Sequence, residues 1–289
     1  MAAEPVRGEI ESGTSVGAVH LIVADLERSL ACYGSAVGLA LIERQGGCAR
    51  IGVGERVLVV LEEQPGARPA TGYTGLYHFA LLVPERVDLA RWLAHAARER
   101  VPLVGLSDHF VSEALYLTDP DGHGIEIYWD RPRELWEGQV AERMTTEPLN
   151  VNDLLSELDD PAAEPFEALA PGTVMGHVHL KVAGIAETIA FYRDVLGLGL
   201  MARLGHSAAF FGAGGYHHHI GANTWESAGA AAAPERAARL RHATIVLPDA
   251  AARDEVRDRL AASDVVTRDT QYGPMCHDPS GNALVLTVA

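Results

Sequence analysis

Two hydrophobic periods alternate along this chain. A short run of β-branched and apolar residues, typical of a buried strand, is followed by a segment with apolar residues at helical spacing, such as "DLERSLACYGSAVG" (25–38) or "ERVDLARWLAHAARER" (85–100). Shorter apolar runs then follow, separated by Gly, Pro and Asp turns. This order predicts a β-α-β-β-β unit. It occurs four times, and we call the four ranges modules one to four: 16–62, 73–130, 174–225 and 240–289.

The second half of the chain repeats the first. The stretch "VGAVHLIVADLERSLACYGSAVGLALIER" from Val16 aligns with "MGHVHLKVAGIAETIAFYRDVLGLGLMAR" from Met175 at a constant shift of 159 residues. Asp119 of "TDPDGHGIEIYW" and Asp278 of "HDPSGNALVLTV" have the same shift, whereas His78 aligns with His242 at a shift of 164. A repeat of this kind predicts a duplicated structure, here of the α+β class.

A long connector separates the two halves. Residues 14–130 contain modules one and two, residues 174–289 contain modules three and four, and residues 131–173 form an acidic linker with five prolines. Within this linker, "NVNDLLSELDD" (150–160) predicts a short capped helix. The remainder is longer than a compact domain needs, so the linker is able to carry the chain across from one half to the other.

Charge and composition exclude several classes of partner. The 289 residues include 23 Lys and Arg against 39 Asp and Glu, which gives a net charge of −16. Nucleic acids and anionic membranes both need basic surfaces, so we expect neither as a partner. The start of the chain has no basic and apolar leader, no apolar run approaches the ~18 residues of a membrane span, and the three cysteines form no C-x-x-C pair. These features favour a cytoplasmic protein with free thiols, and they leave a homo-oligomer open.

Four stretches carry a resemblance to a known family. They are "FYRDVLGL" (191–198), "TGLYHFALLVP" (74–84), "VSEALYLTDPDGHGIEIYWDRP" (111–132) and "GGYHHHIGANTW" (214–225). With its four β-α-β-β-β modules, the chain resembles the vicinal-oxygen-chelate superfamily of glyoxalase I, extradiol dioxygenases and bleomycin-resistance proteins. The likeness is greatest to the bacterial catechol-2,3-dioxygenase family. It implies that paired modules curl into two half-barrel domains, and that a half-barrel surrounds a divalent metal.

The resemblance also implies which positions hold the metal. Ligands in this superfamily come from the first strand of each module and from the last strand of some. The corresponding positions here are Ala18, His78, His177 and His242 on first strands, and Glu126 and Val285 on last strands. Pairing modules one with two, or three with four, leaves the ligand set incomplete. Pairing two with three assembles His78, Glu126 and His177, a facial triad suited to non-haem Fe(II), with Mn(II) as the alternative.

This pairing leaves modules one and four together, without a metal. Ring-cleaving relatives more often pair consecutive modules, so the pairing itself stays open at this point. His179 is the rival to His177, because alternate residues of a strand share a face. His20 stands at the equivalent place in module one, which indicates a structural role for that position.

Ring cleavage would need further groups beside the metal. Tyr116 lies ten residues before Glu126 and His109 precedes it, as the resemblance implies for hydrogen-bond donors to substrate oxygens. On a strand, His217 and His219 would point one way and His218 the other. The resemblance implies that His219, at the last-strand position of module three, is a non-ligating active-site histidine with an acid–base role.

The function implied is therefore an Fe(II)-dependent extradiol dioxygenase that cleaves a catechol with O2. A glyoxalase-like metal-dependent isomerase and a non-enzymatic, drug-binding resistance protein remain as alternatives. The isomerase would need a second ligand carboxylate, whereas the resistance protein would need no triad.

Overall fold

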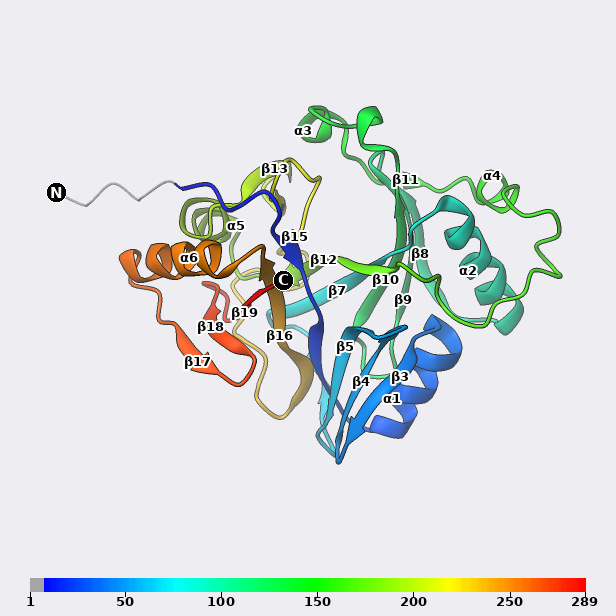
Figure 1. The fold of residues 1–289 in the computed structure, drawn as a ribbon, viewed down its shortest axis with the longest axis horizontal. Coiled ribbons are helices and arrows are strands. Elements are labelled where there is room, and N and C mark those ends of the chain that lie inside the picture. Colours follow the sequence, from blue (N-terminus) through cyan, green and yellow to red (C-terminus); the bar gives the residue numbers. More distant parts are fainter. Residues whose placement is uncertain (1–7) are drawn as a thin grey trace.

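The computed structural model describes residues 8–289. The start of the chain, where no targeting leader is expected, lies partly in residues 1–7, outside the described residues. Each predicted module contains a strand, a helix and three further strands, so the α+β class is confirmed (Figure 1). None of the helices within 8–289 is long and apolar enough to cross a membrane.

The modules contain the following elements. Module one comprises β2 (Val19–Val23), α1 (Leu26–Cys32), β3 (Ala40–Gln45), β4 (Cys48–Val53) and β5 (Arg56–Glu63). Module two comprises β7 (Gly75–Leu82), α2 (Arg86–Glu99), β8 (Leu103–Asp108), β9 (Ser112–Thr118) and β10 (Gly124–Asp130). Module three comprises β12 (Val174–Lys181), α5 (Ile185–Ile189), β13 (Gly199–Leu204), β14 (Ala208–Gly212) and β15 (Ile220–Asn223). Module four comprises β16 (Ala237–Leu247), α6 (Ala250–Ala262), β17 (Arg268–Thr270), β18 (Gly273–His277) and β19 (Ala283–Val288).

Shorter elements lie outside or between the modules. They are β1 (Ser15–Val16), β6 (Arg68–Pro69), a 3-10 turn (Arg133–Leu135), α3 (Val140–Arg143), β11 (Glu147–Pro148) and α4 (Val151–Leu155). Helices α1 and α5 each continue into a π-helical turn, at Tyr33–Val37 and Ala190–Val195.

The linker packs against module two. Its strand β11 pairs with the edge strand β8. The helix predicted within 150–160 is confirmed as α4, although it is shorter than the pattern; its N-cap Asn150 accepts a hydrogen bond from the backbone N–H of Asp153. Arg86 of α2 forms ion pairs with Asp153 and Glu157, which hold the linker on this side of the molecule.

The two sheets join modules that are not consecutive. One sheet has nine strands in the order β11-β8-β9-β10-β7-β12-β15-β14-β13, and so contains modules two and three. The other has ten strands, with the order β17-β18-β19-β16-β2-β5-β4-β3 and with β1 and β6 also on β16, and so contains modules one and four. We call them the first and the second half-barrel. Each draws strands from both sequence ranges, 14–130 and 174–289.

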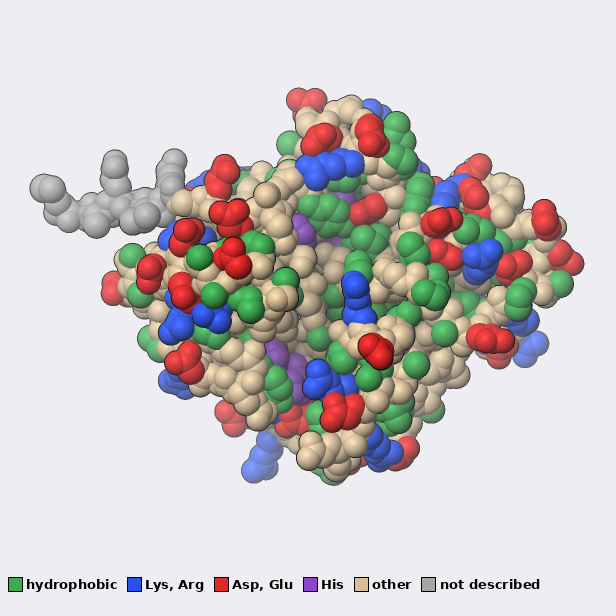
Figure 2. All heavy atoms as spheres, viewed as in Figure 1, with side chains coloured by type: hydrophobic (Ala, Val, Ile, Leu, Met, Phe, Trp, Pro, Cys, Tyr) green, Lys and Arg blue, Asp and Glu red, His purple; other side chains and the backbone are tan. Residues whose placement is uncertain are grey.

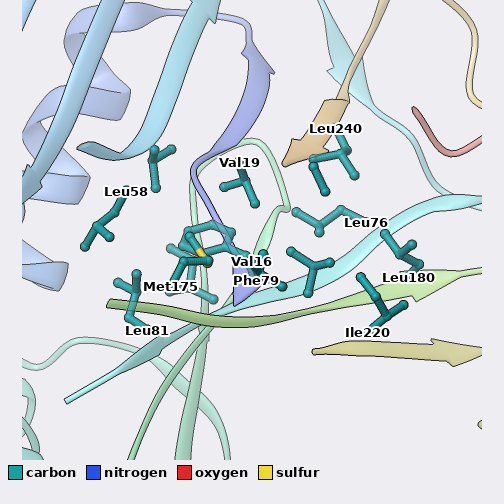
Figure 3. Close-up of a cluster of buried hydrophobic side chains, with 14 of the residues drawn as sticks. Val16, Val19, Leu58, Leu76, Phe79, Leu81, Met175, Leu180, Ile220 and Leu240 are labelled. Carbon is teal, nitrogen blue, oxygen red and sulfur yellow. The ribbon is translucent and has the colours of Figure 1, made fainter. Parts of the chain in front are cut away.

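The half-barrels pack against each other through a shared hydrophobic core. Figure 3 shows side chains such as Val19 and Leu240 of the second half-barrel beside Phe79 and Leu180 of the first. All four are buried, and this exclusion of apolar surface from water is the main stabilising contribution.

A duplicated hydrogen bond also crosses between the half-barrels. The Tyr33 hydroxyl of module one donates to Oδ2 of Asp119 in module two over 3.1 Å. Tyr192 of module three donates to Oδ2 of Asp278 in module four over the same distance. Residues at equivalent positions of the repeat therefore make equivalent contacts, and consecutive modules stay joined although they lie in different sheets.

Candidate active site

Three neighbouring strands of the first half-barrel bring the predicted ligands together. The central strand β7 runs parallel to β10 and antiparallel to β12. Ala80 of β7 lies opposite both Glu126 and His177, and His78 is two residues earlier on the same face. Side chains from two halves of the sequence therefore converge at one point of the sheet.

The distances within this group are short. Nε2 of His78 is 2.9 Å and Nε2 of His177 is 3.1 Å from Oε2 of Glu126. One ligand atom from each residue can be chosen so that all lie within 4.8 Å of one another, and all three residues are buried. The structure thus contains a buried His/His/Glu triad.

The electrostatics favour the metal-binding forms of these groups. Burial acts to raise the pKa of Glu126, but the adjacent imidazoles of His177 and His78 outweigh it and hold this pKa well below its usual range. Burial lowers the pKa of His177, partly opposed by Glu126. An ionised carboxylate beside a neutral imidazole is the state in which both groups donate lone pairs to a cation.

An unsatisfied buried nitrogen tests whether a metal fits. Nε2 of His78 is buried and forms no hydrogen bond within the described part of the chain, although it lies close to Glu126. Such an atom is costly to bury without a partner, and a divalent cation would supply one. Two imidazoles and one carboxylate on one side of the ion would leave the opposite positions open. The donor set therefore fits a catalytic metal.

The triad lies at the wall of a cavity of about 450 Å³. The linker residues Met144, Thr145 and Thr146 form part of the lining, so this connector also covers the site. The other walls are largely apolar and aromatic, with polar groups near the triad. They include Leu76, Tyr77, Ile125, Phe210 and Trp225 together with His109, Tyr116, His179 and His218.

Tyr116 and His109 lie beside the triad and contact each other. Tyr116 lies opposite Glu126 on the adjacent strand β9. Nδ1 of His109 is 2.7 Å from the carbonyl oxygen of Thr145, which can only accept, so Nδ1 is the donor. With Nδ1 as the donor, the other ring nitrogen, Nε2, is the acceptor for the Tyr116 hydroxyl, which lies 2.7 Å away. Burial and the nearby Glu126 raise the pKa of Tyr116 well above its usual value, so this phenol keeps its proton.

The prediction that His217 and His219 point one way and His218 the other, as on a strand, is wrong. Strand β15 begins only at Ile220, so residues 217–219 precede it and do not alternate between two faces. His218, and not His219, lines the cavity, with its ring centroid 4.1 Å from that of His177. His219 instead accepts a hydrogen bond from the backbone N–H of Ala213 at Nδ1. Burial lowers the pKa of His219 to about 4, so this imidazole is a neutral packing residue beside the site.

The matching of His219 to the position of Glu126 is also wrong. Glu126 lies opposite Ala80 of β7, two residues after His78. The equivalent residue in module three lies opposite His179 of β12, and this is Gly221. A Cβ atom at Gly221 would be 2.9 Å from Cγ of His179, so the imidazole of His179 takes the space of a side chain there.

The sequence analysis missed a supporting chain of polar groups. Nε2 of His217 is 2.7 Å from Oδ1 of Asp130, which can only accept. The Nδ1 atoms of His217 and His218 are 2.8 Å apart and share one hydrogen. Burial, and next the neighbouring His177, lower the pKa of His218 well below its usual value, so its ring is neutral. When His217 is neutral as well, Nδ1 of His218 donates and Nε2 of His218 remains as an acceptor.

Tyr216 completes this chain by donating to Oδ2 of Asp130 over 2.7 Å. The signal for Asp130 was present in the sequence, since Glu126, Tyr128 and Asp130 alternate on one strand and share a face.

His179, the predicted rival of His177, is not part of the triad but lines the same cavity. It lies directly opposite His78 on the paired strand, and its Nε2 is buried without a hydrogen-bond partner.

Comparison with known proteins places this geometry in a family. Residues 15–127 and 174–286 each match the model of the glyoxalase/bleomycin resistance protein/dioxygenase superfamily. The chain is 40% identical over 287 residues to a catechol-2,3-dioxygenase of Bacillus subtilis (strain 168), covering 96% of this chain and 99% of that protein. It is thus a homologue of that enzyme over nearly its full length.

Solved structures show the same fold at lower identity. A Bacillus subtilis protein described as a candidate dioxygenase superposes with a TM-score of 0.64 at 16% identity, over 97% of this chain and 86% of that one. Glyoxalase I from Zea mays superposes with a TM-score of 0.57 at 16% identity, over 94% and 92% of the two chains. The duplicated modules, the curled sheets and the family match agree, and this chain belongs to the glyoxalase/bleomycin resistance protein/dioxygenase superfamily.

Proposed function

We propose that this protein is an extradiol dioxygenase that cleaves the ring of a catechol with O2 at a metal held by His78, Glu126 and His177. The observation that carries the proposal is the convergence of this triad on a cavity of about 450 Å³, in a chain 40% identical to a catechol-2,3-dioxygenase. The triad suits Fe(II), and Mn(II) is the alternative. A bound metal of this kind would supply open coordination positions and the electron transfer between an aromatic diol and O2.

The cavity suits a single-ring diol. Tyr77, Phe210 and Trp225 offer aromatic surface to a flat ring. Polar side chains such as Tyr116 and His218 lie beside the triad, and the ion pair of Lys181 and Glu226 also lines the cavity. The cavity would therefore orient the two hydroxyls toward the ligands and the rest of the ring toward the apolar walls.

His218 is the acid–base candidate in place of His219. Its neutral ring lines the cavity beside His177, and its Nδ1 is engaged by His217. Nε2 of His218 would accept a catechol proton, and the carboxylate of Asp130 behind His217 would stabilise the resulting positive charge.

Tyr116 and His109 would hold reacting oxygens by hydrogen bonds. In the described arrangement the Tyr116 hydroxyl donates to His109, and it could be redirected to an oxygen atom that enters the cavity.

Two alternatives from the same superfamily fit the site less well. A glyoxalase-like isomerase would need a second carboxylate in the position of Gly221, where no side chain exists and His179 fills the space. A non-enzymatic binding protein has no need of a buried His/His/Glu triad, whose uncompensated carboxylate would cost stability.

The test is anaerobic loading with Fe(II), followed by catechol and O2. We expect a yellow ring-fission product near neutral pH and an uptake of one O2 per catechol. Glu126→Gln is the matched control, since it keeps the shape of the side chain and removes its charge; it should lose both iron and product. Full iron content and turnover in that variant, or isomerisation of a hemithioacetal without O2 uptake, would overturn the proposal.

A further inference from the structure

The second half-barrel contains a cavity of its own. Its volume is about 410 Å³, close to the 450 Å³ of the first. It lies against strands that include β2, β4, β5 and β16, and histidine side chains are visible inside the hollow between β16 and β5 (Figure 2). The residues that line it are Ala18, His20, Glu43, Gln45, Cys48, Arg50, Val57, Val60, His242, Thr244, Tyr272 and Thr287.

Two facing histidines form the inner wall of this second cavity. His242 of β16 lies directly opposite His20 of β2, as His78 lies opposite His179 in the first half-barrel. The rings of His20 and His242 are 4.9 Å apart, and both make edge or tilted contacts with the ring of Tyr272. The second half-barrel therefore keeps one histidine pair of the first, and Tyr272 contacts both of its rings as Tyr77 contacts those of His78 and His179.

Three of the four ring nitrogens of this pair form no hydrogen bond with any part of residues 8–289. His20 is 1% exposed and His242 is 3% exposed. The three nitrogens are Nδ1 and Nε2 of His20 and Nδ1 of His242. Nε2 of His20 lies 3.2 Å from Oε2 of Glu62, but the contact does not have hydrogen-bond geometry. Buried polar atoms are normally satisfied, so these nitrogens indicate a missing partner within the cavity.

The missing partner is not a metal ion. Within residues 8–289 the triad of the first half-barrel is the one group of three ligand atoms close enough to hold an ion. At the position that corresponds to Glu126, opposite Thr244, the second half-barrel has Val285. The position that corresponds to His177 is Ala18, and the nearby carboxylate of Glu62 is already paired with Arg241, so the ligand set of the first half-barrel is not reproduced.

The charges around the cavity are already paired. Glu62 forms an ion pair with Arg241, and Arg50 lies 3.6 Å from Glu43. Burial, followed by the nearby Arg241, lowers the pKa of His20 to about 4, which leaves a neutral imidazole near pH 7. A neutral imidazole offers one donor and one acceptor, and such a wall favours an uncharged ligand with a hydroxyl group.

We propose that the second half-barrel binds a small, uncharged aromatic alcohol of the phenol class. Its hydroxyl would bond to the free nitrogens of His20 and His242, and its ring would lie against Tyr272 and the aliphatic side chains of Val57 and Val60. Without the ligand triad of the first half-barrel, this site binds and does not react. The inference does not depend on the activity proposed for the first half-barrel.

The test is a titration of the full-length, metal-free protein with 4-fluorophenol, followed by ¹⁹F NMR. Because the first cavity could also take a phenol, two matched variants separate the sites. His242→Leu should weaken the binding measured in the second cavity by about tenfold or more. His179→Leu makes the same change in the first cavity and should leave that binding component unchanged.

A cavity-filling variant keeps the test decisive if His242→Leu fails to fold. Cys48→Phe places a ring into the same cavity and leaves both histidines in place. We expect it to abolish the second binding component while the thermal unfolding curve and the activity on catechol persist. The proposal is overturned if wild-type protein shows no saturable binding, if Cys48→Phe binds as wild type does, or if crystals soaked in 4-fluorophenol show only water beside His20.

Discussion

In the first half-barrel β7 places His78 opposite His179 of β12, and in the second β16 places His242 opposite His20 of β2. The parallel strand beside each pair also has the same register: Glu126 lies opposite Ala80, and Val285 lies opposite Thr244. The backbone frame of the site is thus present twice.

The difference between the two frames lies in two side chains. Glu126 and His177 in the first half-barrel correspond to Val285 and Ala18 in the second. The carboxylate matters most, because it alone gives a buried cluster of neutral imidazoles a net negative charge that attracts a cation. One frame therefore forms a metal-binding triad, and the other is a cavity in which, among the described residues, both nitrogens of His20 and Nδ1 of His242 form no hydrogen bond.

The largest effect is expected when Glu126 is replaced by valine, the residue type found at the corresponding position, Val285, of the second half-barrel. For Glu126→Val we expect metal affinity to fall by about 10²- to 10³-fold or more, because the buried triad loses the carboxylate whose negative charge attracts the cation. Ring-cleaving activity should be lost. Metal analysis of dialysed protein and an O2-uptake assay check both results. Val285→Ala is the control and should change neither; a stoichiometric metal content in Glu126→Val would contradict the comparison.

The next largest effect should distinguish the catalytic role proposed for His218 from the role of His219. His218→Gln should lower kcat by about 10²-fold with metal content unchanged, because the proton acceptor in the cavity is lost. His219→Gln changes a residue that faces Ala213 and should leave kcat within about threefold. Steady-state kinetics on catechol measure both variants. A greater loss in His219→Gln would restore the original assignment from the sequence.

The reverse transfer should build a metal site in the second half-barrel. On the Glu126→Val background, Ala18→His together with Val285→Glu should restore about one metal equivalent per chain, since the strand registers already match. Without metal the new buried carboxylate should destabilise the fold by several kcal/mol, so added metal should raise Tm. Metal analysis and thermal unfolding measure the outcome. A folded variant that binds no metal would show that the frames differ in more than these two residues.

The smallest effect concerns the bonds that join the half-barrels. Tyr33→Phe and Tyr192→Phe each remove one hydroxyl that donates to a buried aspartate. Each should lower the free energy of unfolding by about 1–2 kcal/mol, as measured by urea denaturation. Equal losses are expected from the equal geometry. A loss in only one variant would show that the duplicated contacts have diverged.

Much of the site was accessible from the sequence because it lies on regular strands. The residues on strands are His78, Glu126, His177 and Tyr116. The face of the sheet to which each side chain points follows from the two-residue period of a strand.

The errors arose where the chain leaves regular structure. His217 to His219 precede β15, so a strand period assigned the wrong residue to the cavity. The position of Gly221 depends on the register between β12 and β15, and a register cannot be read from one strand alone.

The resemblance to a known family supplied the residues able to hold a metal. By itself, the sequence determined the four modules, their duplication and the α+β class. These properties are local or periodic, and they follow from the alternation of apolar and polar residues. Only the tertiary structure decided that His218 faces the cavity, that Asp130 supports it through His217, and that a second cavity contains His20 and His242. Each of these depends on how strands and loops far apart in the chain pack together, because burial and hydrogen bonding are set by neighbours in space.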